Sequence, residues 1–309
     1  ENMEKAERFR GCLLGLAVGD ALGTTLEFKP PGTFKPITDM VGGGPFDLQP
    51  GQWTDDTSMA LCLAESLVEC KGFNPKDQME RYVRWWREGY LSSTGTCFDI
   101  GNTTRTALAA FLKTGNPYSG PTEPRTAGNG SLMRLAPVPM FYADDPGEAI
   151  GKSGESSRTT HGAEACIDAC RYFGGLIAGA LLGATKEELL SNCYAPIPDF
   201  WKEHTLVSEI DEIARGSFKE KNPPEIRGTG YVVQSREAAL WAFHKSDTFV
   251  EGCLMAVNLG DDADTTGAIY GQIAGAYYGE EVISGQWLSI LAFPNLVASL
   301  AERMFHINP

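Results

Sequence analysis

Two short acidic stretches, far apart in the sequence, contain the residue types best suited to chemistry. They are Trp53-Thr54-Asp55-Asp56-Thr57 and Gly260-Asp261-Asp262-Ala263-Asp264-Thr265-Thr266. Adjacent carboxylates repel each other and lose hydration when buried, which a protein tolerates mainly where a hard cation compensates their charge. Asp and Thr oxygens without Cys or His suit Mg²⁺, Mn²⁺ or Ca²⁺ rather than structural zinc. We therefore interpret the two stretches as halves of one metal site.

Simple helix capping by Thr54 or Asp55 is the competing interpretation of the first stretch, because this stretch precedes an apolar helical pattern. One Thr or Asp at a helix start usually accepts backbone N–H bonds and does nothing else. Four capping-type residues in a row, from Thr54 to Thr57, exceed what one helix start can use. The second stretch is no EF-hand, since the glycine and terminal glutamate of that loop are missing. Carboxylates and threonines from both stretches could hold two cations, which typically clamp an oxygen-rich substrate and activate a water.

The elements that must position these residues are predicted to be helices. Helical patterns cover Glu4–Leu22, the residues after Ser58, Pro75–Tyr90, Thr104–Leu112, Ser156–Ile177, the residues after Val232, Phe249–Asn258 and Gly267–Tyr278. No long alternating pattern predicts strands. The expected class is all-α, a compact orthogonal multi-helix bundle, and we expect a single domain over residues 1–309.

Glycines mark the first of these helices and several of the connections. Gly11, Gly15, Gly19 and Gly23 recur at every fourth place, which lowers helix propensity but permits close helix packing. Residues 30–51 hold many glycines and prolines and predict a long loop of the kind that often carries function. Residues 186–236 are more charged and less periodic, and we expect short peripheral helices with little chemistry there.

Composition excludes several classes of function. The chain has 309 residues with 42% hydrophobic content, and no segment approaches the ~20 apolar residues that span a bilayer. Residues 1–10 are charged and contain no signal-peptide core. Eight cysteines without a C-x-x-C pair predict buried, reduced thiols and a cytoplasmic location. A formal net charge of −14 disfavours nucleic-acid binding, and neither export nor membrane insertion is expected.

Several other polar residues allow both a structural and a functional interpretation. Asp20 and Glu27 are either a cap and a surface acid or neighbours of the polar site, and Asp99 is either a cap or a substrate contact. Glycines flanking Asn129 would let backbone amides approach a ligand, although the spacing matches neither a Walker loop nor a dinucleotide fingerprint. His161 is either a structural hydrogen-bonding residue or part of a polar edge.

Taken together, these motifs resemble those of the ADP-ribosylglycohydrolase family. The matching segments are Gly-Asp-Ala-Leu-Gly (19–23), Glu27, Trp-Thr-Asp-Asp-Thr (53–57), Phe-Asp-Ile-Gly (98–101), Gly-Asn-Gly-Ser-Leu-Met-Arg (128–134), Thr-His (160–161) and Gly-Asp-Asp-Ala-Asp-Thr (260–265). They keep their order and spacing from about residue 8 to about residue 280. The pattern is most similar to the bacterial branch typified by dinitrogenase reductase-activating glycohydrolase.

The resemblance implies an all-α fold with a binuclear Mg²⁺ or Mn²⁺ centre below a cleft for ADP-ribose. The metal ligands it implies are Thr54, Asp55, Asp56, Asp262, Asp264 and Thr265. The substrate-binding residues it implies are Asp99, Gly101, Asn129, Gly130, Ser131, Met133 and His161. Glu27, Asp99 and Asp56 are the implied catalytic residues, with either Glu27 or Asp99 moving the leaving-group proton.

The implied reaction is removal of ADP-ribose from a modified protein side chain, with ADP-ribose as the product. Water activated at the metals or by a carboxylate would attack the anomeric carbon of a metal-held ribose. The match at residues 98–101 favours the N-glycosidic bond of ADP-ribosyl-arginine. The alternatives are O-linked serine or polymer substrates, a non-catalytic ADP-ribose-binding protein, or a different metal-dependent hydrolase such as a phosphoesterase. Toxin immunity and general removal of the modification would use the same residues.

Overall fold

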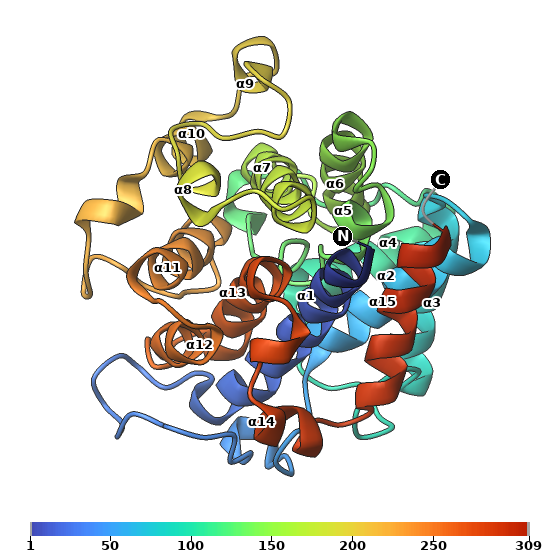
Figure 1. The fold of residues 1–309 in the computed structure, drawn as a ribbon. Helices are drawn as coiled ribbons and strands as arrows, with labels where there is room; N and C mark the ends of the chain where they lie inside the picture. The colour runs from blue at the N-terminus through green and yellow to red at the C-terminus, as the bar shows by residue number, and fades with distance from the viewer. Residues whose placement is uncertain (1, 308–309) are drawn as a thin grey trace.

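The computed structural model describes residues 2–307, and within that range it contains fifteen α-helices and no β-strand (Figure 1). Only two isolated β-bridges, Gly43 with Leu48 and Gly128 with Tyr231, join extended segments there. The expected all-α class is therefore confirmed. None of the described helices is both long and apolar enough to cross a membrane.

The helices of the N-terminal half are α1 (Asn2–Gly23), α2 (Asp55–Cys70), α3 (Pro75–Glu88), α4 (Asn102–Thr114), α5 (Pro137–Phe141) and α6 (Pro146–Thr160). Those that follow are α7 (Glu164–Leu181), α8 (Lys186–Leu189), α9 (Phe200–Glu203), α10 (Ser208–Ala214), α11 (Val232–Lys245), α12 (Phe249–Val257), α13 (Ala263–Tyr278), α14 (Gly285–Ile290) and α15 (Pro294–Ile307). Short 3₁₀ turns are η1 (Thr24–Leu26), η2 (Gly44–Phe46), η3 (Pro124–Thr126), η4 (Ser217–Glu220) and η5 (Glu280–Val282).

The antiparallel pair of α1 and α13 forms the centre of the fold, and Figure 1 shows the two helices side by side. Their glycines face each other at backbone contact. A Cβ on Gly15 would lie 2.2 Å from the Gly271 carbonyl oxygen, and one on Gly271 would lie 1.9 Å from that of Gly15. Any side chain at these positions would force the helices apart. The predicted role of the glycines in close packing is therefore confirmed.

This pairing brings the C-terminal end of α1 to the N-terminal end of α13, because Gly19 faces Gly267 and Gly23 faces Ala263. Helix α2, whose first residue is Asp55, contacts both α1 and α13. Three segments that are distant in the sequence therefore converge at one end of the central pair. The two acidic stretches lie there, as the interpretation of one shared site requires.

Two expectations about local structure are wrong. Residues 156–160 end helix α6 instead of opening a helix, and α7 begins only at Glu164. Helix α6 starts at Pro146, with the Asp145 side chain accepting the Glu148 N–H, which is a strong N-terminal signal. All eight cysteines are free as predicted, but not all are buried, since Cys70 is exposed.

Candidate active site

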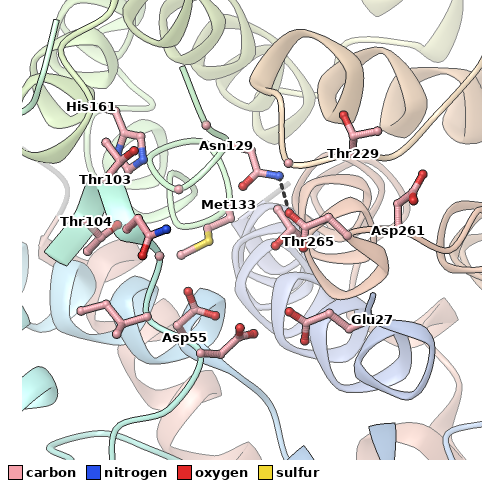
Figure 2. A pocket seen from close by; sticks show the side chains of 18 of the residues that line it. Glu27, Asp55, Thr103, Thr104, Asn129, Met133, His161, Thr229, Asp261 and Thr265 are labelled. Carbon is pink, nitrogen blue, oxygen red and sulfur yellow. Dashed lines mark hydrogen bonds between the residues drawn. The ribbon is translucent and has the colours of Figure 1, made fainter. Parts of the chain in front are cut away.

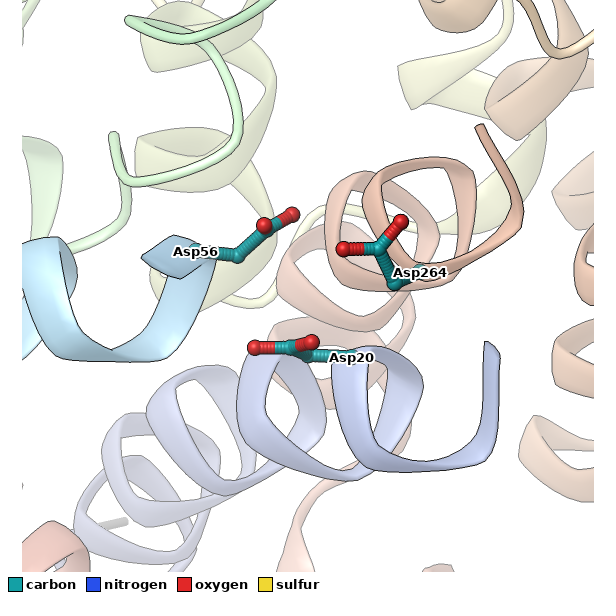
Figure 3. Close-up of side chains that lie close together, drawn as sticks. All are labelled: Asp20, Asp56 and Asp264. Carbon is teal, nitrogen blue, oxygen red and sulfur yellow. The ribbon is translucent and has the colours of Figure 1, made fainter. Parts of the chain in front are cut away.

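Asp264 is the common member of three groups of carboxylates at the junction of α1, α2 and α13. Each group has ligand oxygens within 4.8 Å of one another. The groups are Asp20 with Asp56 and Asp264, Glu27 with Asp262 and Asp264, and Asp55 with Asp99 and Asp264. Figure 3 shows Asp20, Asp56 and Asp264 converging from the three helices. The acidic stretches thus form one cluster, to which α1 adds Asp20.

Thr54 lies at the centre of the first group and cannot satisfy all of its neighbours. Its hydroxyl oxygen lies 2.8 Å from a carboxylate oxygen of Asp20, 2.9 Å from one of Asp264 and 3.1 Å from one of Asp56. A hydroxyl has one proton to donate. At least two of these short oxygen–oxygen contacts therefore need a further proton or a cation between them.

Neither Thr54 nor Asp262 acts as a capping side chain. Each is the N-cap residue of its helix, α2 or α13, yet neither side chain accepts a hydrogen bond from the first turn. Thr54 instead faces the carboxylates, and Asp262 accepts a 2.8 Å hydrogen bond from the Asn129 side-chain amide. The capping interpretation of Thr54 is therefore wrong.

Burial of so many acids raises their pKa values. Burial, with the nearby charge of Asp262, raises the pKa of Asp56 to about 6. The pKa values of Asp55 and Asp264 rise well above their ordinary range, chiefly through burial and then through neighbouring carboxylates. Without a compensating cation, the cluster therefore retains protons that isolated carboxyl groups would lose.

The donor set fits hard divalent cations. Oδ1 of Asp264 and Oε2 of Glu27 are buried and have no hydrogen-bond partner among the described residues. Each of these oxygens is therefore available to coordinate a cation. A buried acceptor without a hydrogen-bond partner otherwise lowers the free energy of unfolding. Their neighbours are carboxylates and threonine hydroxyls, which suit Mg²⁺ or Mn²⁺.

A cleft of about 620 Å³ opens above this cluster. The predicted site residues that line it are Glu27, Asp55, Asp99, Gly101, Asn129, Gly130, Met133, His161, Asp262 and Thr265. Figure 2 shows Asn129 and His161 across the pocket from Glu27 and Asp55. Thr54, Asp56 and Asp264 are buried and do not line it.

Glu27 and Asp99 lie against each other at the cleft wall, each within hydrogen-bonding contact of the other carboxyl. Burial, followed by this contact, raises the pKa of Glu27 well above its ordinary range. Burial, with the charges of Asp56 and Asp262, raises the pKa of Asp99 to about 7. Asp99 also has a positive φ of 63°, which is uncommon outside glycine. The two acids are placed to share a proton.

The loop around Asn129 and Gly130 forms another wall. A Cβ on Gly130 would lie 2.6 Å from the His161 ring, so glycine is required for this approach. Burial lowers the pKa of His161 to about 3, and the ring is therefore neutral at pH 7. Ser131 does not line the cleft: its hydroxyl is buried and lies 2.8 Å from that of Ser157. A direct side-chain contact between Ser131 and substrate is therefore not supported.

Residues 228–230, between η4 and α11, form a backbone strap beside the cleft that the sequence patterns did not predict. The Gly228 carbonyl accepts the Asp262 N–H at 2.9 Å, and the Gly230 carbonyl accepts the Asn129 N–H at 3.0 Å. Thr229 and Gly230 line the cleft. The expectation of little chemistry in residues 186–236 is therefore wrong for this strap. The two glycines at 228 and 230 were its only sequence signal.

Comparison with known proteins agrees with this architecture. The family model described as ADP-ribosylglycohydrolase matches residues 1–308. ADP-ribosylarginine hydrolase Tri1 of Serratia proteamaculans (strain 568) is 44% identical over 306 residues, which cover 99% of this chain and 81% of that protein. The ADP-ribosyl-[dinitrogen reductase] glycohydrolase of Rhodospirillum rubrum is 32% identical over 293 residues, covering 92% and 90%.

A solved structure described as an ADP-ribosylglycohydrolase-related protein complex superimposes with a TM-score of 0.87. It is 44% identical in sequence, and the match covers 99% of this chain and 100% of that one. The resemblance drawn from the motifs is thereby confirmed, and this chain belongs to the ADP-ribosylglycohydrolase family.

Proposed function

We propose that this protein is a metal-dependent hydrolase that cleaves the N-glycosidic bond of ADP-ribosyl-arginine in modified proteins and releases ADP-ribose. The observation that carries the proposal is the Glu27–Asp99 pair on the wall of a cleft that has the acidic cluster beneath it. Similarity over nearly the whole chain to a protein named ADP-ribosylarginine hydrolase supports arginine as the linkage. The pKa of Asp99, which burial and the charges of Asp56 and Asp262 raise to about 7, suits proton transfer near neutral pH.

Each wall of the cleft has a separate task in this proposal. Asn129, Gly130, Met133 and His161 would bind the ADP-ribose, and the neutral His161 ring would also pack against Gly130. Asp99 or Glu27 would give a proton to the guanidine nitrogen as the bond from this nitrogen to the anomeric carbon breaks. Water would add to the anomeric carbon, and its released proton would return to the carboxylate pair. Gly101, two residues after Asp99, is the N-cap residue of α4, and its backbone would contact the sugar.

Two divalent cations, Mg²⁺ or Mn²⁺, are the proposed cofactors. Thr54, Asp55, Asp56, Asp262, Asp264 and Thr265 would hold them, and Asp20 would orient Thr54. Bound there, the cations would fix the ribose hydroxyls and activate water. We also propose that residues 1–309 act as a single domain in the cytoplasm, with ADP-ribosylated proteins rather than nucleic acids as partners.

The test offers arginine-linked, serine-linked and polymeric ADP-ribose to the protein, with Mg²⁺, with Mn²⁺ and with a chelator, and identifies the products by mass. We expect ADP-ribose from the arginine-linked substrate with metal present. Asp264→Asn should abolish this turnover, whereas Asp144→Asn, at a position that does not line the cleft, should not. Release of phosphate, or full turnover by Asp264→Asn, would refute the proposal.

A further inference from the structure

Three phenylalanines from separate segments, Phe28, Phe46 and Phe98, form a row of contacting aromatic rings beside the cleft. The ring centroids of Phe28 and Phe46 are 6.4 Å apart, and those of Phe46 and Phe98 are 5.1 Å apart. Phe28 directly follows Glu27, and Phe98 directly precedes Asp99. Each of the two contacting acids, Glu27 and Asp99, therefore has one of these phenylalanines as its neighbour in the sequence. Phe46, from the long loop, packs between the rings of the other two.

Phe28 is held in a position that folding alone would not favour. Its side chain is 64% exposed although it lines the cleft, and its backbone has a φ of 67°. A positive φ at a bulky residue costs free energy and persists only where the surrounding structure imposes it.

Two backbone hydrogen bonds impose this conformation. The Phe28 N–H donates to the Asp261 carbonyl at 2.7 Å, and the Asp261 N–H donates to the Lys29 carbonyl at 2.8 Å. Asp261 itself has a positive φ of 52° and pairs with Arg227 at 3.0 Å. The segment that fixes Phe28 thus leads directly into the acidic cluster.

We propose that Phe28 is a specificity residue that stacks against the guanidinium and aliphatic stem of the ADP-ribosylated arginine. This inference rests on the proposed function and deepens it. Figure 2 shows Asn129 and His161 across the pocket from Glu27, and Phe28, the residue after Glu27, lines the same cleft. With the ADP-ribose bound at Asn129 and His161, the arginine side chain would lie on the Glu27 side of the cleft, within reach of the Phe28 ring.

The chemistry of this side of the cleft fits a planar cation. An aromatic face attracts a guanidinium, which also stacks on it with little loss of hydration. The lining of the same cleft includes the acidic residues Glu27, Asp99 and Asp261. A serine-linked substrate carries no cation at this point and would gain little from the ring. Phe46 supports Phe28 from outside the cleft and acts as a positioning residue.

The test measures kcat/KM for ADP-ribosyl-arginine, together with the affinity for ADP-ribose, in the Mg²⁺- or Mn²⁺-loaded protein. For Phe28→Ala we expect kcat/KM to fall by about 3- to 30-fold, the range of an aromatic–cation contact, with ADP-ribose affinity unchanged. Phe28→Tyr should retain activity, whereas Phe28→Leu should lose it although the residue stays apolar. Unchanged ADP-ribose affinity shows that the cleft remains folded.

Phe293→Ala is the matched control, because Phe293 is also exposed, at 55%, and also has a positive φ, but it does not line the cleft. It should leave kcat/KM unchanged. If wild type cleaves the arginine linkage and Phe28→Ala is equally active, this inference is wrong and the proposed function stands. If wild type does not cleave that linkage, the proposed function fails and the inference fails with it.

Discussion

Replacing Asp56 by Asn should make the metal-free protein more stable while removing its activity. The wild-type carboxyl is fully buried, and its pKa rises from an ordinary 3.8 to about 6. One pKa unit corresponds to about 1.4 kcal/mol, so ionised Asp56 destabilises the fold by about 3 kcal/mol. Asn keeps the shape without the charge. It can still accept one of the hydrogen bonds from Thr54 and Thr265, and losing the other costs about 1 kcal/mol.

The net gain should be about 1–3 kcal/mol, or a rise in Tm of about 2–8 °C, in a chelator at pH 7.5. Because the folded pKa lies above the unfolded one, the penalty is complete above about pH 6 and absent below about pH 4. The advantage of Asp56→Asn should therefore vanish in acid. Adding Mg²⁺ or Mn²⁺ should reverse the order, since only wild type gains binding free energy, about 2.7 kcal/mol at a hundredfold excess over Kd.

Asp168→Asn is the matched control, with the same substitution at a buried carboxylate whose charge is compensated, and with the opposite expected sign. Asp168 pairs with Arg171 at 2.8 Å and accepts the Val207 backbone N–H at 2.7 Å. An amide nitrogen would face one of these donors, so the metal-free protein should lose about 1–3 kcal/mol. Thermal scans with chelator and with metal measure both variants. A metal-free Asp56→Asn protein less stable than wild type would refute the idea that Asp56 is an uncompensated charge.

Three further outcomes follow from the packing and the cleft. Gly271→Ala should lower Tm sharply or prevent folding, because the new Cβ would lie 1.9 Å from the Gly15 carbonyl oxygen. Gly151→Ala is the control, because no atom lies within 4 Å of its Cβ position. It should raise the unfolding free energy by about 0.5–1 kcal/mol in a denaturant titration. Burial lowers the pKa of His161 to about 3, so the ring is neutral in the folded protein. Below about pH 6 the unfolding free energy of wild type should therefore fall by about 1.4 kcal/mol per pH unit relative to His161→Gln. Urea midpoints at pH 7 and pH 5 measure this difference, and midpoints that shift in parallel would contradict it. Asn129→Ala removes the hydrogen bond to Asp262, and Mn²⁺ affinity measured by calorimetry should fall about 10- to 100-fold, an expectation that equal affinity would exclude.

The parts of the fold that the sequence predicted are those with a periodic side-chain signal. The glycine repeat that includes Gly15 predicted close helix packing. The crowded carboxylates of the two acidic stretches predicted that Asp56 and Asp264 lie in one cluster. The boundary before α7 was not predictable from apolar spacing. Helix α6 (Pro146–Thr160) contains few apolar residues and ends in small polar ones, so no apolar pattern marks where it runs.

The parts of the site that were not predicted act through the backbone or through distant partners. The strap at Gly228 and Gly230 uses carbonyl groups, which every residue has and no residue type marks. The direction of the Ser131 side chain depends on Ser157, which belongs to another helix. Likewise, Asp20 became identifiable as the acceptor for Thr54 only once α1 and α2 had been brought together.

The antiparallel pairing of α1 with α13 has a consequence for synthesis on the ribosome. Helix α1 emerges early, but the glycine face that it presents to α13 has no partner until nearly the whole chain has been translated. Contacts between residues so distant in sequence form late and slowly. A nascent chain therefore leaves this face of α1 without its partner until α13 has been made. It also cannot assemble Asp20, Asp56 and Asp264, so a truncated product would be inactive and would not sequester metal.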